Sequence, residues 1–147
     1  MKEINVTVIG SGSTYCPELI YGFIEAKDSL KLKRVAFMDI DDRKREIVGS
    51  LCVRMLKSAG IDCEVVMTDN LDLALQGADF VVNAIQVGGY DPCTITDFEI
   101  PKKFGLRQTI ADTLGIGGIM RALRTIPVMD DFARDIEQVC PDAWFLN

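Results

Sequence analysis

Short apolar runs alternate along this chain with longer segments whose apolar residues recur at helical spacing, and this alternation limits the possible folds. The short runs predict strands at residues 4–9, 35–38, 62–67, 80–85 and 142–147. The longer segments predict helices at residues 15–26, 42–59 and 118–139, a short helix up to residue 77, and a kink or break at Pro127. Residues 88–106 fit no regular element. Because alternating strands and helices form parallel sheets with right-handed crossovers, we expect an α/β fold: a three-layer, Rossmann-like, doubly wound and mostly parallel sheet, in one domain over residues 1–147.

A glycine-rich turn follows the first predicted strand and leads directly into the first predicted helix. Its residues are Gly10, Ser11, Gly12, Ser13 and Thr14. The first glycine permits a tight turn, and the second lets the backbone approach a pyrophosphate closely. The start of the following helix offers N–H groups to phosphates. The third glycine of a GxGxxG pattern is missing, so the signal depends on the position of the turn between a strand and a helix.

Acidic residues end the second predicted strand, in the sequence Asp39-Ile40-Asp41. A carboxylate at this point of a dinucleotide-binding fold accepts the ribose hydroxyls of adenosine and repels the 2′-phosphate of NADP. The alternative is that both aspartates only cap the second helix. Together with the glycine turn, the pattern predicts NAD binding, with Asp39 as the ribose ligand, Ile40 beside it, and Asp41 as the helix cap.

Composition excludes several classes of function. The 147 residues include 16 Lys and Arg against 22 Asp and Glu, a net charge of −6, which argues against a nucleic-acid or anionic membrane partner. Histidine is absent, so no His base, Ser-His-Asp triad or His metal ligand is available. Five scattered cysteines without a CxxC pair indicate neither a zinc site nor a disulfide framework. With a charged start and no long apolar stretch, we expect a cytoplasmic protein.

Polar residues end the fourth predicted strand before a second glycine turn. Asn83, Ala84 and Gln86 stand where a doubly wound sheet brings the cofactor toward its reactive ring. Asn83 is polar within an apolar run, so we expect it to bond either the backbone or the cofactor. We predict that all three contact the cofactor.

The stretch of residues 105–118 mixes glycines with polar groups before a helix, which is typical of a loop that faces a ligand. Asp112 is its one carboxylate. It either binds sugar hydroxyls or is a helix N-cap or an ordinary loop carboxylate. Arg121 and Arg124 follow one helical turn apart. They either face an anion or pair with nearby acids, and we favour ion pairs with Asp130, Asp131 or Asp135.

Four segments together resemble one known family. They are residues 10–14, 38–41, 86–90 and, above all, 108–124 with the sequence QTIADTLGIGGIMRALR. These segments, with residues 97–99 and 140–147, are similar to glycoside hydrolase family 4, and most closely to its bacterial melibiase-type α-galactosidases. The resemblance covers all 147 residues but only the N-terminal third of such an enzyme.

The resemblance implies a glycosidase that uses NAD⁺ and a divalent metal, usually Mn²⁺, in place of two opposed carboxylates. Its reaction would run through oxidation of the sugar at C3, elimination of the aglycone, addition of water and re-reduction. The phospho-glucosidase branch looks to have an arginine where this sequence has Gln86, so a non-phosphorylated α-galactoside is implied, with α-galacturonides and α-glucuronides as alternatives. Asp112 and Asn147 are implied as substrate contacts.

No residue of this chain matches the family's metal-binding Cys and His or its catalytic Asp and Tyr. We therefore expect no catalytic and no metal-binding residue in this stretch, and no glycosidase activity from it alone. Two other interpretations stay open. One is a domain of the NAD-dependent 2-hydroxy-acid dehydrogenase type, although the expected loop arginine and histidine base are missing. The other is a non-catalytic NAD-binding module. We also expect a homo-oligomer, formed through apolar surface around residues 116–126 and 144–146.

Overall fold

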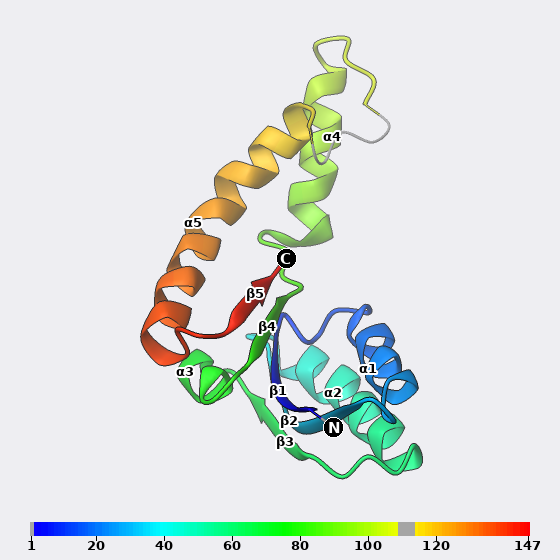
Figure 1. Cartoon of the computed structure of the whole chain (residues 1–147). Coiled ribbons are helices and arrows are strands. Elements are labelled where there is room, and N and C mark those ends of the chain that lie inside the picture. The colour runs from blue at the N-terminus through cyan, green and yellow to red at the C-terminus, as the bar shows by residue number, and fades with distance from the viewer. Residues whose placement is uncertain (1, 109–113) are drawn as a thin grey trace. The chain divides into compact units, whose positions relative to one another are not determined.

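The computed structural model describes residues 2–108 and 114–147 and shows a five-stranded sheet in which all paired strands are parallel (Figure 1). The strand order is β3-β2-β1-β4-β5. The strands are β1 (Lys2–Ile9), β2 (Leu30–Met38), β3 (Glu64–Thr68), β4 (Phe80–Asn83) and β5 (Trp144–Leu146). The helices are α1 (Cys16–Glu25), α2 (Asp42–Ser58), α3 (Leu71–Leu75), a π-helix η1 (Gly89–Thr94), α4 (Ile95–Lys102) and α5 (Ile116–Val139). The predicted α/β, Rossmann-like class is confirmed.

The chain divides into two compact units. The first contains β1 to β4 with their helices, the end of α5 from Asp135, and β5. The second spans Gln86–Arg134 and contains η1, α4 and most of α5.

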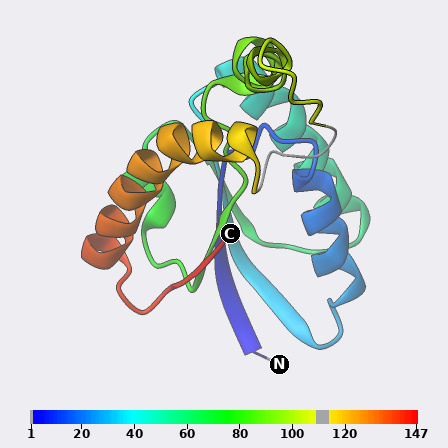
Figure 2. The ribbon, with the colours of Figure 1, turned by 90° about the horizontal axis from the view of Figure 1, so that it is seen from above.

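The core of the first unit lies between the sheet and two helices. α1 and α2 cover one face of the sheet, and α3 lies on the other (Figures 1 and 2). Alternate residues of the central strands point toward α1 and α2, because side chains change face at each step of a strand. These residues pack with Ile20 of α1 and Leu56 of α2 into one buried cluster, which includes Ile4, Val6, Val8, Leu32, Val35 and Phe37.

Polar groups on the opposite face anchor α3 to the sheet. Arg34 is buried, and its guanidinium donates to the carbonyl oxygens of Leu73 and Ala74 at 2.9 and 3.1 Å. The buried Thr7 hydroxyl donates to the Ala74 carbonyl at 2.6 Å. The last carbonyls of a short helix have no partner within the helix, so these donors replace the missing bonds.

Several predicted boundaries are wrong in informative ways. β2 starts at Leu30, five residues earlier than predicted, because Lys31 and Lys33 interrupt the apolar run without leaving the strand. β4 ends at Asn83 and is only partly buried. α5 continues as one helix through Pro127, so the predicted break does not occur.

The segment predicted to be irregular contains two helices. η1 includes Pro92 and a non-helical Asp91, which hide any helical pattern in the sequence. In the second unit, Arg124 of α5 binds Asp97 of α4 in a two-pronged ion pair, with Nη1 to Oδ1 at 3.0 Å and Nη2 to Oδ2 at 2.5 Å. The predicted pairing of Arg124 with acids on its own helix is therefore wrong. Asp97 lies 27 residues before Arg124 in the sequence, so no local pattern indicates it as the partner.

Among the described residues, no helix combines the length and apolar character needed to cross a membrane.

Candidate functional site

The β1–α1 turn is held against the ends of two neighbouring strands. The amides of Gly10 and Ser11 donate to the carbonyl of Met38, the last residue of β2, at 2.9 and 3.0 Å. Gly10 has φ +82, and a Cβ there would lie 2.8 Å from the Ala84 carbonyl carbon and oxygen, just after β4. Any larger residue would be strained by its backbone angle and would collide with the Ala84 backbone. The turn can therefore approach the Ala84 backbone this closely only with glycine at position 10.

Asp39 joins the glycine turn to the end of β2. Its Oδ2 accepts the Gly12 N–H at 2.7 Å, and its Oδ1 accepts the Asp41 N–H at 2.9 Å. A Cβ at Gly12 would lie 2.6 Å from the Lys44 Cβ and 2.9 Å from Asp39 Oδ2. A carboxylate oxygen can accept more than one hydrogen bond, so each Asp39 oxygen keeps capacity for a further donor. The structure thus brings the two predicted motifs into direct contact.

Residues around Asp39 fix its position. Arg45 of α2 donates to the Asp39 carbonyl at 2.5 Å. Asp41 is the N-cap of α2 and accepts the Lys44 N–H at 3.0 Å, as predicted. This backbone bond lowers the pKa of the Asp41 carboxyl, with a smaller contribution from the Lys44 side chain. Ile40 lies between the two aspartates with 87% of its surface exposed, so an apolar surface stands beside the carboxylate.

The start of α1 lacks a side-chain cap. Tyr15 at the N-cap makes no capping bond, and Pro17 in the first turn has no N–H. Ser13 stabilises the turn before it, donating its amide to the Gly10 carbonyl at 3.0 Å. The buried Ser11 Oγ has no hydrogen-bond partner among the described residues. An uncapped helix start carries a partial positive charge, which suits a phosphate group.

The end of β4 brings two predicted residues together. Asn83 Nδ2 donates to Asn147 Oδ1 at 2.8 Å, just after β5. The adjacent Ala84 amide donates to the Ile9 carbonyl at 2.8 Å, which extends the β1–β4 pairing by one bond. The sequence named Asn83 and Asn147 for different roles. Their contact depends on the β4–β5 pairing, which no local pattern reveals.

The two other predicted residues fall elsewhere. Gln86 begins the second unit, where its Nε2 donates to the Thr94 hydroxyl at 2.7 Å. Thr94 was not singled out from the sequence, since a lone threonine in an irregular segment gives no signal. Asp112 lies outside the described residues.

The site fits a dinucleotide better than a metal ion. Two positions admit only glycine, the helix start beyond them is uncapped, and Asp39 offers acceptors at the adjoining strand end. Within residues 2–108 and 114–147, no three His, Cys, Asp or Glu side chains gather into a group that could hold a metal ion. The glycine turn and Asp39 therefore offer groups suited to a dinucleotide.

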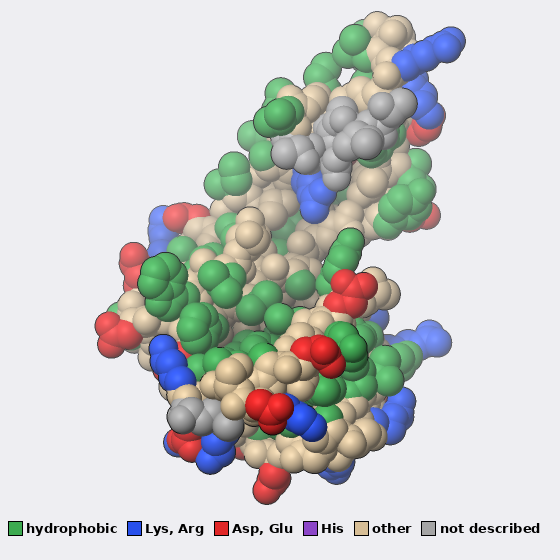
Figure 3. Space-filling model, turned by 45° about the vertical axis from the view of Figure 1, so that its right-hand side comes forward, with side chains coloured by type: hydrophobic (Ala, Val, Ile, Leu, Met, Phe, Trp, Pro, Cys, Tyr) green, Lys and Arg blue, Asp and Glu red, His purple; other side chains and the backbone are tan. Residues whose placement is uncertain are grey.

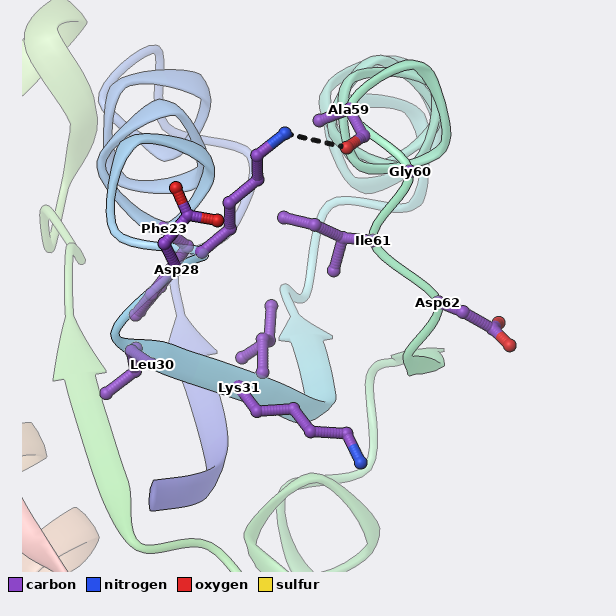
Figure 4. A pocket seen from close by; sticks show the side chains of 10 residues that line it. Phe23, Asp28, Leu30, Lys31, Ala59, Gly60, Ile61 and Asp62 are labelled. Atoms are coloured by element: carbon purple, nitrogen blue, oxygen red, sulfur yellow. Dashed lines mark hydrogen bonds between the residues drawn. The ribbon is translucent and has the colours of Figure 1, made fainter. Parts of the chain in front are cut away.

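A hollow of about 430 Å³ lies at the opposite end of the sheet (Figure 4). It is bounded by the C-terminal ends of α1 and α2 and by the start of β2, and Lys27 Nζ donates to the Ala59 carbonyl across it at 3.4 Å. Asp62 points away from this contact (Figure 4). The hollow is far from the glycine turn, because that turn follows the carboxyl end of β1.

Comparison with known proteins finds glycosidases among the relatives in sequence and among the solved structures with a similar fold. An alpha-galactosidase of Bacillus subtilis is 48% identical over 147 residues, covering 100% of this chain and 34% of that protein. A probable 6-phospho-beta-glucosidase of the same organism is 39% identical and is covered over 33% of its length. A 6-phospho-alpha-glucosidase from gut microorganisms, solved in complex with NAD and Mn²⁺, superposes with a TM-score of 0.90 at 26% identity, over 99% of this chain and 32% of that one.

The chain spans about a third of the length of the curated relatives that it matches. Residues 5–147 match the sequence model of the family described as family 4 glycosyl hydrolase. The match includes the glycine turn, Asp39 and the β4 end described above. This chain therefore belongs to the family 4 glycosyl hydrolases.

Proposed function

We propose that this chain is the NAD-binding domain of a glycosidase, extending over residues 1–147. The observation that carries the proposal is the contact between Asp39 and Gly12, 2.7 Å from Oδ2 to N, beside a turn that admits only glycine at position 10. This arrangement supports a ribose acceptor at Asp39 beside a phosphate-binding turn. The NAD bound by the structural relative supports the same assignment.

Each predicted cofactor residue has a role in this proposal. Residues 10–14 hold the pyrophosphate against the start of α1, and Ser11 Oγ has unused bonding capacity there. Asp39 accepts the adenosine ribose hydroxyls, and its charge disfavours the 2′-phosphate of NADP. Ile40 offers an apolar surface to adenine. Asn83, Ala84 and Gln86 serve the nicotinamide end of the site.

The cofactor, when bound, supplies a hydride acceptor for a carbon that carries a hydroxyl group. This chain's own part is to bind and orient it, because the chain has no histidine and its described residues form no cluster of three His, Cys, Asp or Glu side chains. We therefore propose that the chain alone does not hydrolyse glycosides and that Mn²⁺ is held outside the described residues. Assay of the 147-residue chain with NAD⁺, Mn²⁺ and 4-nitrophenyl α-galactoside should give no nitrophenol. Turnover in that assay would contradict this part of the proposal.

The proposed substrate is a non-phosphorylated α-galactoside. The neutral Gln86 occupies the position where the sequence resemblance implies an arginine in phospho-glucosidases, and the 48% identical relative is an alpha-galactosidase. Asn147, bonded to Asn83 at 2.8 Å, is proposed to contact the sugar, as is Asp112. We also propose a cytoplasmic homo-oligomer without nucleic-acid or membrane partners. Family membership favours the glycosidase over the 2-hydroxy-acid dehydrogenase.

Nuclear magnetic resonance of the ¹⁵N-labelled, NAD⁺-loaded chain tests the substrate class. Galactose should shift the Gln86 side-chain amide signals, and galactose 6-phosphate should shift them much less. In Gln86→Arg, which lacks these signals, the backbone amide shifts of residue 86 should show the reverse preference, because a guanidinium binds phosphate through charge-assisted bonds. Stronger binding of the phosphorylated sugar by the unaltered chain would contradict the assignment.

A further inference from the structure

We infer that Thr94 is a positioning residue that fixes the direction of the Gln86 amide and so makes this position selective for a sugar hydroxyl over a phosphate. The inference rests on the proposed function, since it concerns the same substrate position. It starts from two hydrogen bonds at one hydroxyl. Gln86 Nε2 lies 2.7 Å from Thr94 Oγ1, and Thr94 Oγ1 lies 3.4 Å from the Gly89 carbonyl oxygen.

The single hydroxyl hydrogen of Thr94 decides which end of the Gln86 side-chain amide faces the hydroxyl. A threonine hydroxyl has one hydrogen, and a carbonyl oxygen can only accept. Once the Thr94 hydrogen is directed to Gly89, the hydroxyl can only accept from Gln86. The amide must therefore turn its Nε2 toward Thr94, and its Oε1 points away from it.

The structure around Thr94 holds this geometry in place. Gly88, with φ +88, has no room for a Cβ, which would overlap the Cys93 side chain and lie 3.4 Å from Arg124 Nε. Arg124 in turn is bonded to the buried Asp97, three residues beyond Thr94 on α4. Hydrogen bonding with Asp97 raises the pKa of Arg124, which favours the charged guanidinium in this pair. The Thr94 hydroxyl therefore lies on a segment of the second unit that is held at Gly88 on one side and at the Asp97–Arg124 ion pair on the other.

The exposed part of Gln86 then has a defined chemistry. The side chain is exposed, and it presents Oε1 together with the second Nε2 hydrogen. A sugar hydroxyl matches this pair, because it can donate to Oε1 and accept from the N–H. A phosphate dianion only accepts hydrogen bonds, so it has no hydrogen to donate to Oε1 and is repelled by that oxygen. Without the Thr94 hydroxyl the amide can rotate and offer both hydrogens to a phosphate.

The experiment compares three variants of the ¹⁵N-labelled chain, with the Gln86 amide signals assigned by their loss in Gln86→Met. Thr94→Val removes the hydroxyl at nearly constant volume, and Thr94→Ser keeps it. Thr96→Val is the matched control, since Thr96 is an exposed threonine in the first turn of α4, two residues after Thr94. In Thr94→Val the hydrogen-bonded Nε2 proton should move upfield, whereas in Thr94→Ser and Thr96→Val it should stay.

Titration with galactose and with galactose 6-phosphate provides the second readout. The preference for galactose should fall about fivefold in Thr94→Val, the factor expected for one neutral hydrogen bond, and should persist in the other two variants. An unmoved proton in Thr94→Val would overturn the inference, as would an unchanged preference. NAD⁺ titration of the unaltered chain distinguishes failure of the Thr94 inference from failure of the proposed function. Normal NAD⁺ binding with an unchanged preference contradicts the role of Thr94 alone, whereas a lack of NAD⁺ binding contradicts the proposed function.

Discussion

At the scale of single residues, Asp39 has an observed structural role and a proposed binding role. It accepts the Gly12 and Asp41 amides and is proposed to accept the ribose hydroxyls as well. Asp39→Asn keeps the size and one acceptor oxygen but removes the charge. We expect NAD⁺ affinity to fall roughly 10- to 100-fold, the range for a hydrogen bond to a charged group, and NADP⁺ affinity to fall less. Fluorescence titration with both nucleotides measures this, and an equal loss for both would contradict the role in selectivity.

Gly10 gives the second prediction at this scale. Gly10→Ala places a methyl group 2.8 Å from the Ala84 backbone at a positive φ. We expect the free energy of unfolding to fall by about 1–3 kcal/mol or more, since the collision involves backbone that cannot move aside. Gly22→Ala in α1 is the matched control, because a Cβ there meets no atom within 4 Å, and it should be neutral or slightly stabilising. Urea unfolding compares them, and similar stability of both variants would show that the turn is not packed as described.

At the scale of elements, α2 depends on its Asp41 cap, which gives a prediction for pH. The Lys44 amide lowers the pKa of Asp41 in the folded state. The stabilisation is therefore complete above the unfolded pKa of about 3.9 and is lost as the pH falls through the lower folded value. Asp41→Asn caps the helix at any pH. Urea unfolding should show the unaltered chain losing stability relative to this variant below about pH 4. A stability difference between the two proteins that stays constant from neutral pH to below pH 4 would contradict this prediction.

Elements also show what the sequence can and cannot predict. The glycine turn between β1 and α1 and the Asp41 cap were predictable, because each depends on a few adjacent residues with fixed backbone roles. The contacts of Thr94 with Gln86 and of Asp97 with Arg124 were not, because they depend on how η1 and α4 fold. The non-helical Asp91 and Pro92 conceal η1 from any periodicity argument.

At the scale of the whole molecule, exposed apolar side chains predict self-association. Leu123 and Ile126 of α5 are 67% and 63% exposed, and Trp144 of β5 is 69% exposed. Hydrophobic side chains lie among charged ones over the face shown in Figure 3. Large apolar surfaces are typical of interfaces. Sedimentation velocity should show a concentration-dependent oligomer that Leu123→Glu weakens. Glu18→Gln on α1 serves as the surface control and should leave it unchanged. A monomer at every concentration would contradict the prediction.

The most direct test of the account is calorimetric titration of the 147-residue chain with NAD⁺, beside NADP⁺ and an Asp39→Ala variant. We expect saturable NAD⁺ binding, weaker NADP⁺ binding, and loss of affinity in the variant, because the Gly10–Thr14 turn and the Asp39 carboxylate are in direct contact and are proposed to form one site. Circular dichroism confirms that each sample is folded. A folded chain that binds neither nucleotide, or that binds NAD⁺ equally well without the Asp39 carboxylate, would contradict it.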